Sequence, residues 1–228
     1  SNKSMIAKLK GDKDSYYLTF DEIPQSVKDA MVVTEDRDFY KHEGVNFLST
    51  AKAAVMLVES KLRHQDISRG GSTITQQLAK NVFLSNERSY ERKVREIFIA
   101  LDLEKKYTKD QILEFYINNI YFANGYYGIE AASKGYFNKS AKDLDLAEAA
   151  FLCSIPNRPS LYNPLEHYKN TLKRKSRILK QMLDADCITA AEYSDANYEE
   201  IILNPAQALK TQNYMTTYAI SCATKSLM

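Results

Sequence analysis

The chain has 228 residues and a formal net charge of +2, with 26% charged and 44% hydrophobic residues. This balance is typical of a globular protein and excludes a disordered or fibrous chain. The net charge is too small to indicate a nucleic-acid partner by itself, and no such partner is expected. Only 7 Gly and 5 Pro are present, so the composition favours helices.

The three cysteines, Cys153, Cys187 and Cys222, are far apart and odd in number. They show no CxxC spacing, which argues against a disulfide framework or a zinc site, and buried free thiols are expected instead. The three histidines also lack ligand spacing, so a histidine metal site is not expected. The longest apolar run, 53–58, is far shorter than the roughly 20 residues of a membrane-spanning helix.

Hydrophobic spacing and helix-start signals predict a mostly helical fold along the whole chain. Residues 15–20 are expected to form a short strand or an extended arm, and Pro24 suits the first turn of the next helix. Two Thr-x-x-Gln motifs, at Thr73 and Thr108, have the spacing of capping boxes, which open helices. The expected helices cover about 24–33, 47–63, 73–83, 90–106, 108–119, 128–136, 143–153, 165–184, 189–195 and 213–225.

Two features of this pattern concern the arrangement of the helices. The helix expected at 90–106 places Val94, Ile97, Phe98 and Leu101 on one face, which is the spacing of an amphipathic helix. Residues 35–75 are expected to form an irregular lobe beside one main core.

The first segment that could carry chemistry is EDRDFYKHEG at 35–44, which ends a helix and enters a glycine turn. A carboxylate at Glu35 would meet the negative end of the helix dipole, which disfavours its charged form. Apolar neighbours would act in the same direction by desolvation. Such a glutamate suits proton transfer near neutral pH. The alternative is a solvated acidic helix end.

The second segment is GGSTITQQLAKN at 70–81, where two glycines lead into a helix N-terminus rich in hydroxyl and amide groups. Free N–H groups and the positive end of the dipole make such a terminus a natural anion site. Lys80 lies two turns further along the same face as Thr73. The alternative is an ordinary capped helix.

The third segment, RSYERKVRE at 88–96, carries four basic residues around a glutamate. Arginines in such a cluster suit a pyrophosphate, because each offers a fork of N–H donors. A solvated amphipathic helix is the alternative, with Arg92 and Glu96 forming a surface pair. In the following stretch, 109–122, the polar residues Glu114, Asn118 and Asn119 are expected to fix the fold rather than to catalyse.

Together and in this order, these segments resemble the family of peptidoglycan glycosyltransferases. This family comprises the glycosyltransferase domains of class A penicillin-binding proteins and the monofunctional glycosyltransferases. The resemblance covers most of residues 20–165. The matching stretches are EDRDFYKHEGV (35–45), GGSTITQQLAKN (70–81), RKVRE (92–96), KDQILEFYINNIYF (109–122) and LAEAAFLCSIPNRPSLYNP (146–164).

The resemblance implies a mainly α, lysozyme-like fold with a large core lobe and a small membrane-facing lobe. It implies an inverting enzyme that polymerises lipid II into β-1,4-linked glycan strands and releases undecaprenyl pyrophosphate. Inversion requires a base on the face opposite the leaving group. The pyrophosphate is already a good leaving group, so cationic stabilisation matters more than its protonation.

The resemblance also assigns roles to individual residues. Glu35 matches the general base that acts on the acceptor hydroxyl, and Glu96 matches the second glutamate, near the reacting centre of the donor. Lys80 and Arg88 match residues that hold the donor's phosphates. The other substrate-binding residues that it implies are Asp36, Phe39, Lys52, Ser72, Gln76, Gln77, Arg92 and Arg95.

The implied partners are lipid II, the growing glycan strand, the bacterial membrane surface and phosphoglycolipid inhibitors such as moenomycin. No protein metal site is implied, although Mg or Mn is an option at the donor pyrophosphate. Residues 1–203 are expected to form the glycosyltransferase domain, and 204–228 the start of a linker towards a transpeptidase domain. The expected location is the outer face of the cytoplasmic membrane, with an N-terminal anchor that this chain lacks.

Four positions depart from the common pattern of the family. Lys52 stands where many members have an arginine, which leaves its acceptor-site role open. Ile117 replaces a common leucine, and Ala123 and Asn138 replace common glycines. Because these positions lie outside the two glutamates and the phosphate-binding positions, activity is expected to survive.

Two other readings of the sequence stay open. A lysozyme-like hydrolase or lytic transglycosylase would need an acidic glutamate but no pyrophosphate cradle. A catalytically inactive helical scaffold would bind cell-wall partners without depending on Glu35. The weakly charged segment 47–58 is further expected to dip into the membrane interface, as amphipathic segments do.

Overall fold

The computed structural model describes residues 16–46, 71–84 and 89–205. Within these ranges the chain forms eight α-helices and three short 3-10 helices, with no strand beyond the isolated bridge between Tyr121 and Tyr127. The α-helices are α2 (Gln25–Glu35), α4 (Ile74–Phe83), α5 (Tyr90–Lys106), α6 (Lys109–Asn119), α7 (Ile129–Phe137), α8 (Leu146–Cys153), α9 (Pro164–Leu183) and α10 (Ala190–Tyr198). The 3-10 helices are η2 (Phe20–Glu22), η3 (Phe39–Lys41) and η4 (Ala141–Asp143). The helices expected at 47–63 and 213–225 lie outside the described residues.

The helix starts follow from local hydrogen bonds that the sequence predicted. Both Thr-x-x-Gln motifs form full capping boxes, at the start of α4 and of α6. Asp145 and Thr189 form two more, each with a glutamate three residues later. A side-chain N-cap of this kind contributes about 1 kcal/mol, so these ends are set by a few adjacent residues.

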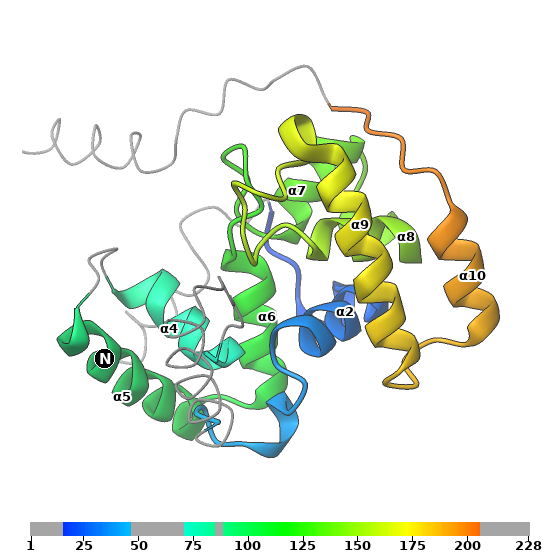
Figure 1. Cartoon of the computed structure of the whole chain (residues 1–228). Coiled ribbons are helices and arrows are strands. Elements are labelled where there is room, and N and C mark those ends of the chain that lie inside the picture. Colours follow the sequence, from blue (N-terminus) through cyan, green and yellow to red (C-terminus); the bar gives the residue numbers. More distant parts are fainter. Residues whose placement is uncertain (1–15, 47–70, 85–88, 206–228) are drawn as a thin grey trace, which may run out of the picture.

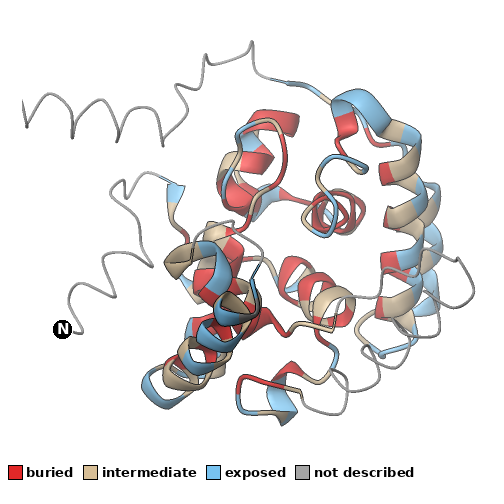
Figure 2. Ribbon diagram, turned by 60° about the vertical axis from the view of Figure 1, so that its left-hand side comes forward, coloured by how far each residue is buried: buried red, intermediate tan, exposed pale blue. Residues whose placement is uncertain are grey.

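The helices form two groups on either side of α6 (Figure 1). On one side α4 packs against α5 and α6, and on the other α2, α8 and α9 pack together with α10 outside them. Buried residues lie on the inward faces of the helices, as the colouring of Figure 2 shows. The largest fully buried side chains are Tyr116, Tyr136, Phe39, Phe122, Phe151, Lys175, Ile23, Met31, Ile74, Leu78 and Leu103.

Residues 17–19, ahead of η2, are extended, and this segment is fastened to α6. Asn118 acts on Leu18 as a neighbouring strand would, accepting from its N–H at 2.9 Å and donating to its carbonyl at 2.8 Å. Glu114 accepts from the Tyr17 hydroxyl at 2.5 Å and from the Phe20 N–H at 2.8 Å. The extended arm expected at 15–20 is confirmed over residues 17–19, and the structural roles expected for Glu114 and Asn118 are confirmed.

The apolar face of α5 is not the face that this helix buries. Val94 is 52% exposed and Phe98 is 68% exposed, whereas Glu96, Ala100 and Leu103 are buried. The reason is that α5 turns its acidic residue inward, towards the start of α4, and leaves two large apolar side chains outside.

Two positions where the resemblance leads one to expect glycine have left-handed backbone. Ala123 has φ 63° and lies in the turn after α6, and Asn138 has φ 55° and is the C-cap of α7. Glycine adopts this conformation without a steric penalty, which explains its use at such positions.

Candidate active site

Glu35 is the last residue of α2, and its side chain is only 5% exposed. The expected position at a helix end is therefore confirmed. The groups that contact its carboxylate are polar. Oε2 accepts a hydrogen bond from Gln77 at 3.1 Å, and Oε1 lies 3.5 Å from Nδ2 of Asn157 and 3.9 Å from Nη2 of Arg174.

Two buried groups lie close enough behind Glu35 to sense its charge. Burial, with a smaller contribution from Glu35, raises the pKa of the Tyr116 hydroxyl well above its usual value. The same two causes raise the pKa of the Cys153 thiol. Both groups are therefore neutral near pH 7, and Tyr116 is available as a hydrogen-bond donor.

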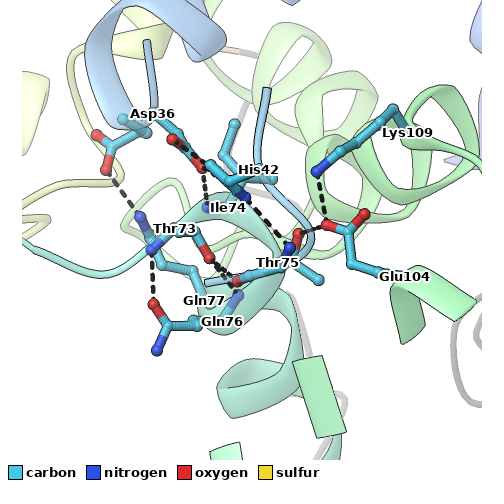
Figure 3. Close-up of polar contacts among 11 residues, drawn as sticks. Asp36, His42, Thr73, Ile74, Thr75, Gln76, Gln77, Glu104 and Lys109 are labelled. Carbon is cyan, nitrogen blue, oxygen red and sulfur yellow. Dashed lines mark hydrogen bonds and ion pairs between the residues drawn. The ribbon is translucent and has the colours of Figure 1, made fainter. Parts of the chain in front are cut away.

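Asp36 ties the end of α2 to the start of α4 (Figure 3). Its buried carboxylate accepts from the Ile74 N–H at 3.0 Å and faces Nε2 of His42 at 2.9 Å. The Gly44 N–H donates to Nδ1 of His42 at 3.2 Å, which places the imidazole proton on Nε2, towards Asp36. The Asp36 carboxylate therefore forms its hydrogen bonds with other groups of the protein.

Phe39 is completely buried and belongs to the support beneath the site rather than to its surface. Nζ of Lys109 lies 4.4 Å from the centre of its ring. The same lysine contacts Glu104 at 2.7 Å, and Glu104 accepts from the Thr75 hydroxyl at 2.6 Å (Figure 3). This network joins α4, α5, α6 and η3 into one unit.

The start of α4 carries the amides and hydroxyls that the sequence indicated, and most of them bond within the protein, as in a capped helix. Thr73 donates its hydroxyl proton to the Gly44 carbonyl at 2.6 Å, and its N–H donates to Oε1 of Gln76 at 3.0 Å. Nε2 of Gln76 is buried and has no hydrogen-bond partner among the described residues. Lys80 is exposed near the other end of the helix.

Glu96 lies inside a basic cluster, and its side chain is 4% exposed. It contacts Nζ of Lys93, and Nη1 of Arg92 lies 3.7 Å from its other oxygen. Lys93 also donates to the Ser72 hydroxyl at 3.0 Å, which links α5 to the start of α4. The Arg92–Glu96 pair therefore joins a buried carboxylate to a partly exposed cation, and Arg95 is exposed beside it.

The predicted residues thus fall into two sets that α4 separates. Gln77 connects the helix to Glu35, whereas Ser72 connects its start to the cluster around Glu96. Lys52 and Arg88 lie outside the described residues.

Asn157, Arg174 and Tyr116 were not among the predicted site residues. Arg174 and Asn157 contact Glu35 across more than a hundred residues of chain, and no local pattern could have indicated this. Tyr116 was expected in the core, and it contributes to the site through its hydroxyl group.

The described part of the chain is thus a mainly helical domain with a buried glutamate at a helix end and a second one among cations. The chain belongs to the Transglycosylase family, whose sequence profile matches residues 2–183. It is homologous to the glycosyltransferase domains of class A penicillin-binding proteins, as the sequence resemblance predicted.

Several relatives support this assignment. Penicillin-binding protein 4 of Bacillus subtilis is 43% identical over 202 residues, which cover 88% of this chain and 32% of the relative. Penicillin-binding protein 1A of Pseudomonas aeruginosa is 45% identical over 184 residues, covering 81% of this chain and 22% of the relative. The chain thus spans about a third or less of the length of these relatives.

A solved structure supports the fold. The crystal structure of penicillin-binding protein 1A from Haemophilus influenzae matches 90% of this chain and 20% of its own, with a TM-score of 0.50 at 24% sequence identity. The expected mainly helical fold is confirmed. No helix in the described ranges is both long and apolar enough to cross a membrane.

Proposed function

We propose that this domain polymerises lipid II into β-1,4-linked glycan strands with inversion, and that Glu35 is the general base. The observation that carries the proposal is the buried Glu35 carboxylate at the end of α2, held by Gln77 on one oxygen and approached only loosely on the other. The loosely held oxygen has capacity to accept a proton from an acceptor hydroxyl.

In the proposed step, the hydroxyl oxygen of the incoming lipid II attacks the anomeric carbon of the growing strand as its proton passes to Glu35. The bond from that carbon to the pyrophosphate breaks, and the electron pair leaves with undecaprenyl pyrophosphate. Attack from the face opposite the leaving group gives inversion.

The basic cluster suits the departing pyrophosphate, because cations placed where negative charge develops lower the barrier. Glu96 holds Lys93 and Arg92 in place, and exposed Arg95 and Lys80 can add charge. Ser72, Gln76 and Gln77 would line the donor site, with Lys52 and Arg88 contributing as the family resemblance implies. Asp36 and Phe39 would contribute by supporting the site from beneath.

A directly bound divalent cation does not fit the residues present. No group of three acidic, histidine or cysteine side chains converges in the described part of the chain. Glu96 already faces two cationic side chains, which compete with a metal ion for its oxygens. We therefore derive no step through Mg or Mn.

The proposal extends to the setting of the domain. The substrate keeps its lipid in the bilayer, so the domain would work at the outer face of the cytoplasmic membrane and would bind phosphoglycolipids such as moenomycin. We further propose that residues 1–203 form the catalytic domain and that 204–228 lead towards a transpeptidase domain.

Polymerisation of labelled lipid II, with glycan products separated by size, tests the proposal. Glu35→Gln should abolish strands and Glu96→Gln should reduce them strongly. Glu91→Gln should leave them unchanged, because Glu91 is exposed on the same helix as Glu96. Strands from Glu35→Gln at the parent rate would refute the assigned base, and digestion of preformed peptidoglycan would favour a hydrolase.

A further inference from the structure

Tyr116 places one hydroxyl in an otherwise apolar part of α6. Its side chain is 1% exposed, and its neighbours on the buried face of the helix include Ile112 and Leu113. A phenylalanine would fill almost the same volume, whereas a buried hydroxyl is costly unless it has a partner. Its partner is Oε1 of Gln77, at 3.1 Å.

The bond to Tyr116 fixes the orientation of the Gln77 amide. A carboxylate accepts hydrogen bonds only, so the amide nitrogen of Gln77 must face Glu35 and its oxygen must face away. The Tyr116 hydroxyl then has to donate, which its raised pKa ensures at all pH values near neutrality. The hydrogen bonds therefore run in one direction, from Tyr116 through Gln77 to Glu35.

This relay acts on one oxygen of Glu35 and leaves the other comparatively free. Oε2 takes the 3.1 Å bond from Gln77, whereas among the described residues the nearest donors to Oε1, Asn157 and Arg174, lie at 3.5 and 3.9 Å. Both contacts to Oε1 are longer than the bond to Oε2, so Oε1 is the more weakly held oxygen.

We infer that Tyr116 is a positioning residue for the reaction: through Gln77 it fixes Oε2 of Glu35 and so presents Oε1 to the acceptor hydroxyl. This inference rests on the proposed role of Glu35 as the base. Tyr116 touches neither substrate in this arrangement, so its effect should appear in the chemical step rather than in binding.

The first variant to measure is Tyr116→Phe, with Tyr136→Phe as its matched control. Tyr136 is also completely buried, and its hydroxyl donates to the Phe122 carbonyl at 2.8 Å, away from Glu35. In lipid II polymerisation, Tyr116→Phe should lower kcat roughly tenfold with KM unchanged, the size expected for one lost orienting hydrogen bond. Tyr136→Phe should keep kcat within about twofold.

A double-mutant cycle with Gln77→Leu separates a relay from independent effects. Each single variant should lower kcat by a similar factor, and the double variant should be no slower than Gln77→Leu alone. If Tyr116→Phe does not fold, Gln77→Leu still tests the anchoring of Oε2, because Gln77 is only half-buried. Full activity in a folded Tyr116→Phe protein, or losses that multiply in the double variant, would overturn the relay.

The outcome of Glu35→Gln distinguishes the two proposals. An inactive Glu35→Gln protein beside a fully active Tyr116→Phe protein defeats the relay alone. An active Glu35→Gln protein defeats the proposed base, whatever Tyr116→Phe does.

Discussion

Nη2 of Arg174 lies 3.9 Å from Oε1 of Glu35. A cationic side chain of α9 therefore lies next to the last residue of α2. The guanidinium also sits 4.9 Å from the centre of the Tyr162 ring, which holds it on the side of Glu35. A carboxylate that is only 5% exposed needs such compensation for its lost hydration.

Replacing Arg174 with glutamine should therefore impair both stability and activity. We expect the free energy of unfolding to fall by about 1–2 kcal/mol, less than for a closely paired buried ion. We expect kcat for lipid II polymerisation to fall at least several-fold, since Glu35 loses a contact that orients it. Arg174→Lys should recover part of both losses. Arg177→Gln is the control, because Arg177 is exposed on the same helix, and an equal effect there would contradict this account.

Gly44→Ala should be strongly destabilising. Gly44 has φ 87°, and an added Cβ would lie 2.9 Å from Cγ of Glu104 and 3.0 Å from the Ala100 carbonyl. Strain in the left-handed region costs about 1–2 kcal/mol, and the clash adds to it, so the free energy of unfolding should fall by about 2–3 kcal/mol. Urea denaturation measures this change. A loss below about 0.5 kcal/mol would mean that the turn rearranges without cost.

Asn138, at the C-cap of α7, should likewise tolerate glycine better than alanine. Because Asn138 is exposed with φ 55°, Asn138→Gly should leave the free energy of unfolding unchanged or raise it by up to about 0.5 kcal/mol. Asn138→Ala should lower it by about 1 kcal/mol, because alanine has neither the freedom of glycine nor the local hydrogen bonding of asparagine. Equal stabilities for the Gly and Ala variants would rule out the left-handed cap.

Stability should decline in alkaline solution. Burial raises the pKa of the Cys153 thiol above 9.0 and that of the Tyr116 hydroxyl above 10.0. A raised pKa in the folded state means that the unfolded chain loses its proton first. The stabilisation is therefore complete below about pH 9 and declines as the pH rises further. Thermal unfolding midpoints measured from pH 7 to 11 should fall above pH 9, and Cys153→Ala should flatten the part between pH 9 and 10. A midpoint that stays constant to pH 11 would contradict this prediction.

The sequence predicted the parts of the molecule that are decided locally. The starts of α4 and α6 follow from four-residue capping boxes, and the sequence also placed Glu35 at the end of a helix. The basic cluster around Glu96 was also visible, because its members are neighbours on one helix.

What the sequence could not provide was the environment created when distant helices meet. The contact between Arg174 and Glu35 depends on how α9 packs against α2. The buried face of α5 could not be assigned from hydrophobicity, because Phe98 points outward and Glu96 inward. Lys93 and Arg92 compensate that inward carboxylate; their spacing indicated the pairing, but not that the pair would face the start of α4.

Because α4 lies between the two sets of site residues, the rotation of the chain along this helix sets the angle between them. Lys93 meets Ser72 just before the helix, and Gln77 meets Glu35 in its first turn. Each residue added to a helix turns everything beyond it by about 100°. One residue inserted between Ser72 and Gln77 would therefore break at least one of these two contacts, so the stretch 72–77 fixes the angle between the base and the cations and tolerates no change in length.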